Sequence, residues 1–126
     1  MRKTFSQLQA KRRAKGKAYN PQGETQAKQL RDSHAWERMS KQYRKRFPLC
    51  LDPYGHHERD GVIVAAVEVH HIVPVTEAPE RGLDESNLAQ LCRDCHERAE
   101  RGGVGERATI AAMVRAQLDG EDWNYG

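Results

Sequence analysis

The sequence predicts a small α+β domain with helices before and after it. A β-branched, mostly apolar run at residues 62–69 leads to two adjacent histidines, as expected for a strand that carries functional groups at its end. A CxxC motif, Cys92 to Cys95, is followed directly by His96 and then by helix-forming residues. Amphipathic helical patterns flank this region on both sides. Together these patterns predict two short strands and several helices around one core.

Length and charge limit the possible organisation. A chain of 126 residues with 37% hydrophobic and 31% charged residues can bury one modest core, so part of it should be solvated. Residues 1–46 carry 14 Lys/Arg against 3 Asp/Glu, a net charge of +11, and the remainder carries 7 against 15, a net charge of −8. A basic arm on an acidic body favours a polyanion partner over a membrane or an acidic protein.

The first 24 residues predict a flexible basic arm. Up to Gly23 they contain no acid and few apolar residues, so they cannot bury enough surface to offset their ordering entropy. We expect cationic side chains of the arm to bind phosphates in a salt-dependent way. These are Arg12, Arg13, Lys15 and Lys17.

The next element is a helix over residues 33–46. Ser33 is a suitable N-cap, and Pro48 ends the helix. Its apolar stripe is predicted to pack into the core, and its basic end to contact nucleic acid. The stripe consists of Trp36, Met39 and Tyr43, and the basic end of Arg44, Lys45 and Arg46.

The remaining elements follow from turn formers and periodicity. Residues 48–61 are expected to form a metal-bound loop with little regular structure, and residues 62–69 a strand or bent hairpin. A surface loop over 74–86, a short strand over 87–91 and a helix over 93–101 follow, the last ending at Gly102. A final amphipathic helix over 106–118 should pack back on the body through Ile110, Met113, Val114 and Leu118.

Cysteine usage indicates metal chemistry in a reducing compartment. Three cysteines cannot form a complete set of intramolecular disulfides, and the chain shows no apolar signal segment and no long hydrophobic span. We therefore expect a cytoplasmic location, in a bacterium or a phage-infected host cell, and no membrane partner.

The order His70-His71, Asn87 and then His96 after a CxxC resembles the motif of the HNH endonuclease family. The combination carries the resemblance, since each part alone is a weak signal. It covers about residues 36–100 and implies the ββα-metal fold, in which a hairpin and a helix hold one divalent ion. It also implies hydrolysis of phosphodiester bonds.

The resemblance implies a role for each matched residue. His71 is the expected general base, and a histidine with its usual pKa of ~6.5 is mostly neutral at cellular pH. His70 and His96 are the expected ligands of a catalytic Mg²⁺, Mn²⁺ or Ni²⁺, and Asn87 fixes the loop that orients the base. Glu100 lies where some relatives have another histidine ligand and many have lysine; an exposed helical carboxylate is the favoured interpretation and a third ligand the alternative.

A second, structural metal site is expected from relatives with two CxxC knuckles. Here Cys92 and Cys95 form one pair, whereas Cys50 has no cysteine three residues later. Since structural zinc normally takes four ligands, the turn after Cys50 should return a histidine to the cysteines. We favour His57, with His56 as the alternate; the rival interpretation is three partly buried thiols and no zinc.

The leading functional hypothesis is a metal-dependent DNA endonuclease that nicks or cuts both strands. It is similar to small phage HNH nucleases that act beside the terminase, which makes terminase or other packaging proteins candidate partners; restriction-like and mobile-element nucleases stay open. One alternative is a non-catalytic, zinc-stabilised DNA-binding or assembly module, and another a secreted nuclease toxin. The expected organisation is an arm (1–24), a nuclease domain with its leading helix (25–103), and a C-terminal helix and tail (104–126).

Overall fold

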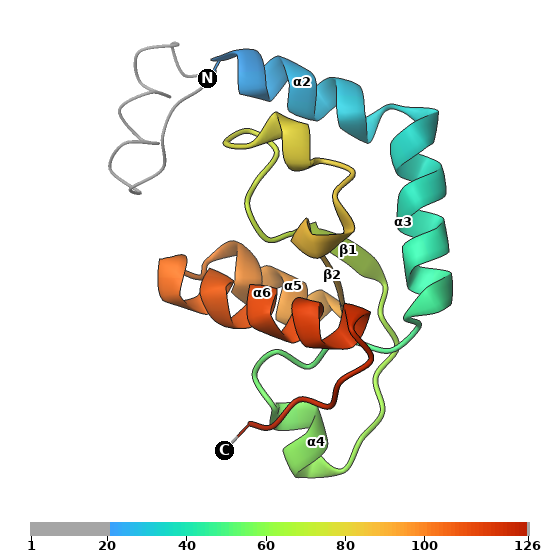
Figure 1. The fold of residues 1–126 in the computed structure, drawn as a ribbon, viewed down its shortest axis with the longest axis vertical. Helices are drawn as coiled ribbons and strands as arrows, with labels where there is room; N and C mark the ends of the chain where they lie inside the picture. The colour runs from blue at the N-terminus through green and yellow to red at the C-terminus, as the bar shows by residue number, and fades with distance from the viewer. Residues whose placement is uncertain (1–20, 126) are drawn as a thin grey trace, which may run out of the picture.

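The computed structural model describes residues 21–125, with side chains from residue 24 onward. Its elements in chain order are α2 (Pro21–Arg31), α3 (His34–Arg46), α4 (His56–Asp60), β1 (Glu68–His71), the 3-10 turns η1 (Pro79–Arg81) and η2 (Glu85–Asn87), β2 (Leu88–Leu91), α5 (Arg93–Glu100) and α6 (Val104–Leu118). This confirms the predicted α+β class. Figure 1 shows α2 and α3 bordering two sides of the body that the later elements form.

In the described part of the chain the sheet consists of two strands, β1 and β2. They pair antiparallel, with Glu68 opposite Leu91 and His71 opposite Leu88. The prediction of a strand over 62–69 was wrong in its bounds, because within the described chain residues 62–67 make one bridge, Ala65 to Leu49, and no ladder. Pairing with β2 instead brings both histidines into the strand.

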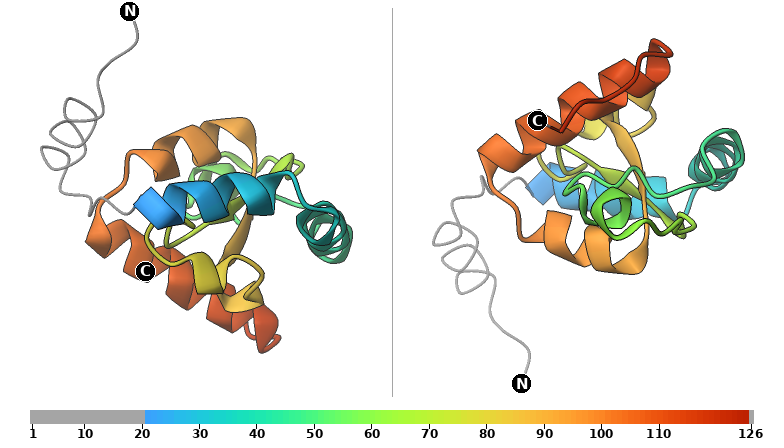
Figure 2. Two further views of the ribbon diagram at one scale, coloured as in Figure 1. Left: turned by 90° about the horizontal axis from the view of Figure 1, so that it is seen from above. Right: turned by 90° about the horizontal axis from the view of Figure 1, so that it is seen from below.

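The core lies between the two late helices. Figure 2 shows α5 and α6 from above and from below, and residues of both helices pack into one buried cluster with Ala89 and Leu91 of β2. Leu88, Leu91 and Cys95 have no exposed surface, and Val114 of α6 is equally buried. The strand over 87–91 and the helices over 93–101 and 106–118 are confirmed within one or two residues. The sheet and α5 therefore rest on a packed base that holds β1 in place.

The N-terminal helices differ partly from expectation. Helix α2 starts at Pro21, so residues 21–24, predicted to belong to the arm, are helical; proline is well suited to the first turn, where its missing N–H is not needed. Residues 1–20, with the predicted phosphate-binding arm side chains, lie outside the described residues. Helix α3 has the predicted cap, with the Ser33 side chain accepting from the Trp36 N–H at 3.1 Å. Of its predicted buried stripe only Tyr43 is buried; Trp36 and Met39 are half-buried.

The segment over 48–61 contains a helix that the sequence did not predict. Helix α4 is short, and the Asp52 carboxylate accepts hydrogen bonds from the N–H groups of His57 at 3.1 Å and Glu58 at 3.0 Å. Asp52 has φ 57°, a left-handed conformation that aspartate tolerates better than most residues. This local capping allows five residues to be helical where turn formers predicted a loop. None of the helices between residues 21 and 125 has the length and apolarity needed to cross a membrane.

Candidate active site and metal centres

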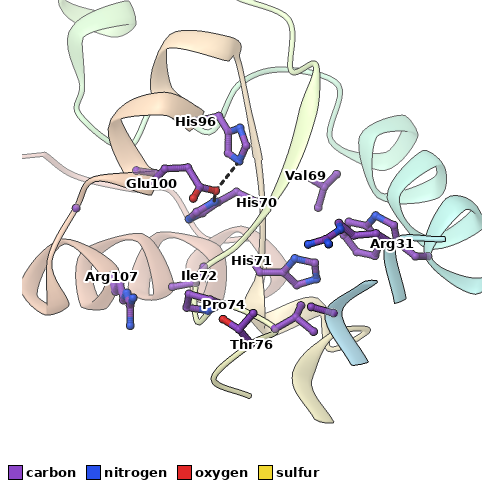
Figure 3. Close-up of a pocket in the computed structure, with 15 residues that line it drawn as sticks. Arg31, Val69, His70, His71, Ile72, Pro74, Thr76, His96, Glu100 and Arg107 are labelled. Carbon is purple, nitrogen blue, oxygen red and sulfur yellow. Dashed lines mark ion pairs between the residues drawn. The ribbon is translucent and has the colours of Figure 1, made fainter. Parts of the chain in front are cut away.

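A pocket of about 320 Å³ opens where β1 meets α2, α3 and α5. The predicted site histidines His70, His71 and His96 all line it, together with Glu100 and Trp36. Figure 3 shows His70, His96 and Glu100 grouped together, with His71 on the side nearer Arg31. The structure thus brings together residues of β1 and of α5, the helix that begins within the CxxC motif.

Three of these side chains offer ligand atoms to one point. His70 Nδ1, His96 Nε2 and a Glu100 oxygen lie within 4.8 Å of one another. The same Glu100 oxygen is 3.4 Å from His70 Nδ1 and 3.1 Å from His96 Nε2. The interpretation of Glu100 as a merely exposed carboxylate needs correction: it is 56% exposed, yet it faces both histidines because it stands one helical turn after His96.

A second carboxylate, that of Glu68, lies beside this group. Its carboxylate contacts His96 Nδ1, so the two ring nitrogens of His96 face two different carboxylates. Glu68 and His70 are two residues apart on β1 and therefore point to the same face of the sheet, toward α5. Burial lowers the pKa of His70 to about 4, against the opposing effect of the Glu100 charge. His70 is therefore neutral near pH 7, with a lone pair free to bind a cation.

His71 is held differently. Its Nε2 lies 2.9 Å from the Gly82 carbonyl oxygen, and its ring stacks on the Trp36 indole with centroids 4.5 Å apart and an interplanar angle of 30°. A carbonyl can only accept, so Nε2 carries the proton and Nδ1 carries the lone pair. Burial lowers the pKa of His71 from its ordinary value, partly offset by the Gly82 hydrogen bond. A neutral imidazole with a defined tautomer is what a general base requires.

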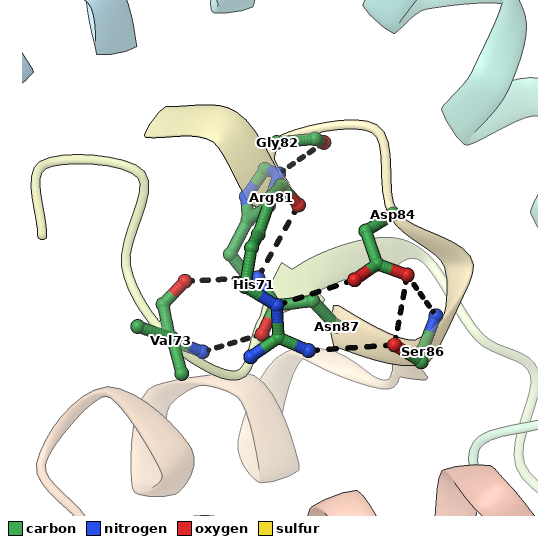
Figure 4. A network of polar contacts seen from close by, with 7 residues as sticks. All are labelled: His71, Val73, Arg81, Gly82, Asp84, Ser86 and Asn87. Atoms are coloured by element: carbon green, nitrogen blue, oxygen red, sulfur yellow. Dashed lines mark hydrogen bonds and ion pairs between the residues drawn. The ribbon is translucent and has the colours of Figure 1, made fainter. Parts of the chain in front are cut away.

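Asn87 ties down the chain just after the two histidines. Its side-chain oxygen accepts from the Val73 N–H at 2.8 Å, and its amide donates to the Val73 carbonyl at 3.0 Å. Figure 4 shows these bonds beside the His71 contact with Gly82. Asn87 is 1% exposed, and its two hydrogen bonds link the start of β2 to the loop that follows β1.

The predicted cysteine cluster also forms. Cys50, His57, Cys92 and Cys95 present four ligand atoms within 4.8 Å of one another, and His57 Nε2 is 3.5 Å from the sulfurs of both Cys92 and Cys95. The crowded thiols share hydrogen bonds, which lower the pKa of Cys50 to about 5, chiefly through Cys95, and raise the pKa of Cys95. The His56 ring lies farther away, 4.0 Å from Cys95.

Comparison with known proteins decides the family. The HNH endonuclease family model matches residues 50–102. The crystal structure of the HNH endonuclease of the deep-sea thermophilic bacteriophage GVE2, with manganese ion, is similar at 32% identity and a TM-score of 0.52, covering 63% of this chain and 83% of that one. The chain belongs to the HNH endonuclease family. No curated protein matches it.

The spacing of both clusters fits the metals that an HNH endonuclease of this kind implies. Ligands at about 2.1 Å from an octahedral ion stand roughly 3.0 Å apart, close to the contacts of Glu100 with the two histidines. Zinc ligands at about 2.3 Å for sulfur and 2.0 Å for nitrogen stand roughly 3.5 Å apart in a tetrahedron, as His57 does from its two cysteines. The donors suit the chemistry too, with oxygen and imidazole in one set and thiols and imidazole in the other.

Several features of this site were not predicted from the sequence. Arg31 and Arg107 line the pocket, whereas the predicted DNA-binding residues of α3 do not. Two of these α3 residues have partners in the protein: Arg44 donates to the Val67 carbonyl at 3.3 Å, and Arg46 forms an ion pair with Glu85 at 3.5 Å. Nothing in the sequence separates Arg31 from its basic neighbours. Glu68 precedes His70 by two residues, and on a strand this spacing places both side chains on one face. That pattern could have indicated the carboxylate that contacts His96.

Proposed function

We propose that this protein is a metal-dependent endonuclease that hydrolyses DNA phosphodiester bonds, by nicking or by cutting both strands. One observation carries the proposal: in one pocket a histidine with a free Nδ1 lone pair, His71, lies beside a His70, His96 and Glu100 ligand set. A base and a cation site side by side are what hydrolysis of a charged diester needs. Family membership supports the same reaction class.

Each residue of the site has a proposed role in the hydrolysis. His71 Nδ1 accepts a proton from the attacking water, while the Gly82 carbonyl holds the opposite nitrogen. His70, His96 and Glu100 would hold a divalent ion such as Mg²⁺, Mn²⁺ or Ni²⁺. When bound, such an ion offsets negative charge on the phosphate and on the leaving oxygen. Asn87 keeps the loop after His71 in place through its two bonds to Val73.

The DNA would approach from the side of the N-terminal helices. Arg107 of the pocket is already paired with Glu77 at 3.2 Å. Arg31 makes no such pair among the described residues, so it is the cation of the pocket available to a phosphate. Lys45 and its neighbours on α3, together with the arm, would add sequence-independent contacts to the backbone.

Zinc at Cys50, His57, Cys92 and Cys95 would stabilise the fold rather than react. Cys95 is fully buried in the core, and the four ligands join the turn after Pro48 to the start of α5. A metal that links these distant segments adds its binding free energy to folding. A reducing cytoplasm, as expected for a phage protein in its host, keeps such thiols available.

A role in phage DNA packaging, with terminase as partner, is the biological context we propose. Its support is the phage origin of the similar GVE2 endonuclease. Affinity purification of the tagged protein from phage-infected cells tests it, with the H71A variant as bait so that the DNA stays intact. Recovery of terminase is the expected result, and its absence from the bound fraction would reject this context without affecting the nuclease assignment.

Plasmid cleavage tests the activity. Supercoiled plasmid is incubated with the purified protein and Mg²⁺, Mn²⁺ or Ni²⁺, with and without EDTA, and nicked and linear products are counted. His71→Ala should abolish cleavage but retain zinc content and fold. His34→Ala is the matched control, since His34 is 91% exposed on α3 and outside the pocket. Retained cleavage in H71A would remove His71 as the base, and DNA binding without cleavage by any metal would favour the non-catalytic module.

A further inference from the structure

The imidazole of His71 is held by groups that β1 does not supply. One edge is fixed by the hydrogen bond from Nε2 to Gly82, and one face lies against the Trp36 indole. The other two histidines of the pocket, His70 and His96, face carboxylates instead. His71 is thus positioned by a backbone carbonyl and an aromatic ring, neither of which competes for its Nδ1 lone pair.

Helix α3 is anchored so that Trp36 has little freedom to move. At its start the Ser33 hydroxyl donates to the Leu30 carbonyl at 2.6 Å and accepts from the Trp36 N–H. Further along, the buried Tyr43 donates its hydroxyl hydrogen to the Leu88 carbonyl at 2.9 Å. Leu88 is the β2 residue opposite His71. The helix that carries the indole is therefore fixed to the strand that pairs with the base.

The second contact of His71 depends on the neighbouring helix. A Cβ built at Gly82 would lie 2.6 Å from Leu30 Cδ2, so α2 packs directly on the turn that offers the carbonyl. Both restraints on His71 therefore involve residues between 21 and 46, which precede the segment 50–102 matched by the family model.

We infer that Trp36 is a positioning residue for the general base. Rotation about the last side-chain torsion of histidine is broad and roughly two-fold, and a half-turn exchanges Nδ1 with a carbon. The stacked indole blocks that rotation, so Nε2–H keeps donating to the Gly82 carbonyl and the Nδ1 lone pair stays free to accept a proton. The inference rests on the proposed function, because it assigns His71 as the base. It also makes the α2 and α3 helices part of the active site.

The test compares Trp36→Leu with Trp36→Phe, which keeps an aromatic face. Since misplacing a reacting group by about 1 Å can cost roughly 100-fold in rate, W36L should lower kcat by at least about tenfold. KM should stay within about twofold, because the proposed phosphate contact, Arg31, is unchanged in the variant. W36F should recover most of the loss. Met39→Ala is the matched control, as Met39 is half-buried on the same helix and does not line the pocket in the described chain.

A second measurement separates this inference from the nuclease assignment. Nitrogen-15 NMR of the imidazole should show His71 as the single Nε2-protonated tautomer in the wild type and W36F, and as an averaged pair in W36L. The NMR measurement does not depend on cleavage, so it tests the role of Trp36 even if the plasmid assay shows no activity. An unchanged tautomer in W36L, or a kcat within twofold of the wild type, would overturn the inference. The inference would also be overturned if the loss of kcat in W36L came with a loss of Mn²⁺ affinity and a lower melting temperature.

Discussion

Asp52 is the residue whose replacement most sharply tests how this chain completes its zinc site. Its carboxylate caps α4 through the N–H groups of His57 and Glu58, and its side chain and carbonyl both accept from the Tyr125 hydroxyl, at 3.3 and 2.5 Å. The residue is 8% exposed, so solvent screens these bonds little. The cap places His57 next to the cysteines.

The magnitude for Asp52→Ala follows from these contacts. Loss of an N-cap costs about 0.5–2 kcal/mol. A left-handed alanine in place of aspartate costs about 1–2 kcal/mol, since φ is 57° here. We therefore expect the free energy of unfolding to fall by about 1.5–4 kcal/mol, and zinc affinity to fall by about 10–100-fold because the ligand His57 loses its support. Asp52→Asn tolerates the same backbone and should lose less.

Urea unfolding and zinc competition with a chromophoric chelator measure the two effects. Cys92→Ser is the reference for outright loss of a ligand. Asp60→Ala is the matched control, since Asp60 ends the same helix, is 53% exposed and pairs with its neighbour Arg59. If D52A kept wild-type zinc affinity while C92S lost it, the idea that the α4 cap positions His57 would be wrong.

Two further predictions concern the pocket. Arg31→Ala should weaken DNA binding and reduce the slope of log affinity against log salt by about 0.9, the value for one phosphate contact, as measured by anisotropy titrations. Lys28→Ala, exposed on the same helix and away from the pocket, is the control and should leave DNA affinity unchanged. Equal losses of affinity in both variants would contradict a specific contact of Arg31. Glu68→Ala should weaken Mn²⁺ binding about 10–100-fold because His96 loses the carboxylate on Nδ1, and Glu68→Gln should lose less. Electron paramagnetic resonance titration of Mn²⁺ decides this, with an unaltered affinity in the alanine variant as the contrary result.

Local signals predicted the elements that local chemistry controls. The bounds of α3 follow from Ser33 and Pro48, and those of α5 from the first cysteine of the CxxC, Cys92, and from Gly102. The strand over 62–69 was misplaced because β-branched composition gives propensity, but pairing partners decide where a ladder forms. Helix α4 was missed because its cap comes from a carboxylate in the preceding turn, whose placement needs the positive φ of Asp52.

The candidate site shows the same division. The spacing of His70, His71, Asn87 and His96 indicated the family, and the comparisons confirmed it. Trp36 was predicted to be core, but it lies on the imidazole of His71. A helical stripe cannot distinguish a residue that packs in the core from one that lines a pocket beside it, because both face the same side of the helix.

The sequence by itself determined which chemical groups this protein has for metal and water: the paired histidines, the asparagine, the CxxC with its histidine, and a separation of basic and acidic halves. Only the tertiary structure decided which groups meet. It brought His57 to the cysteines, two carboxylates to His96, and the N-terminal helices to His71. The physical reason is that covalent spacing fixes neighbours within a turn or strand, whereas contacts between distant segments depend on how the whole core packs.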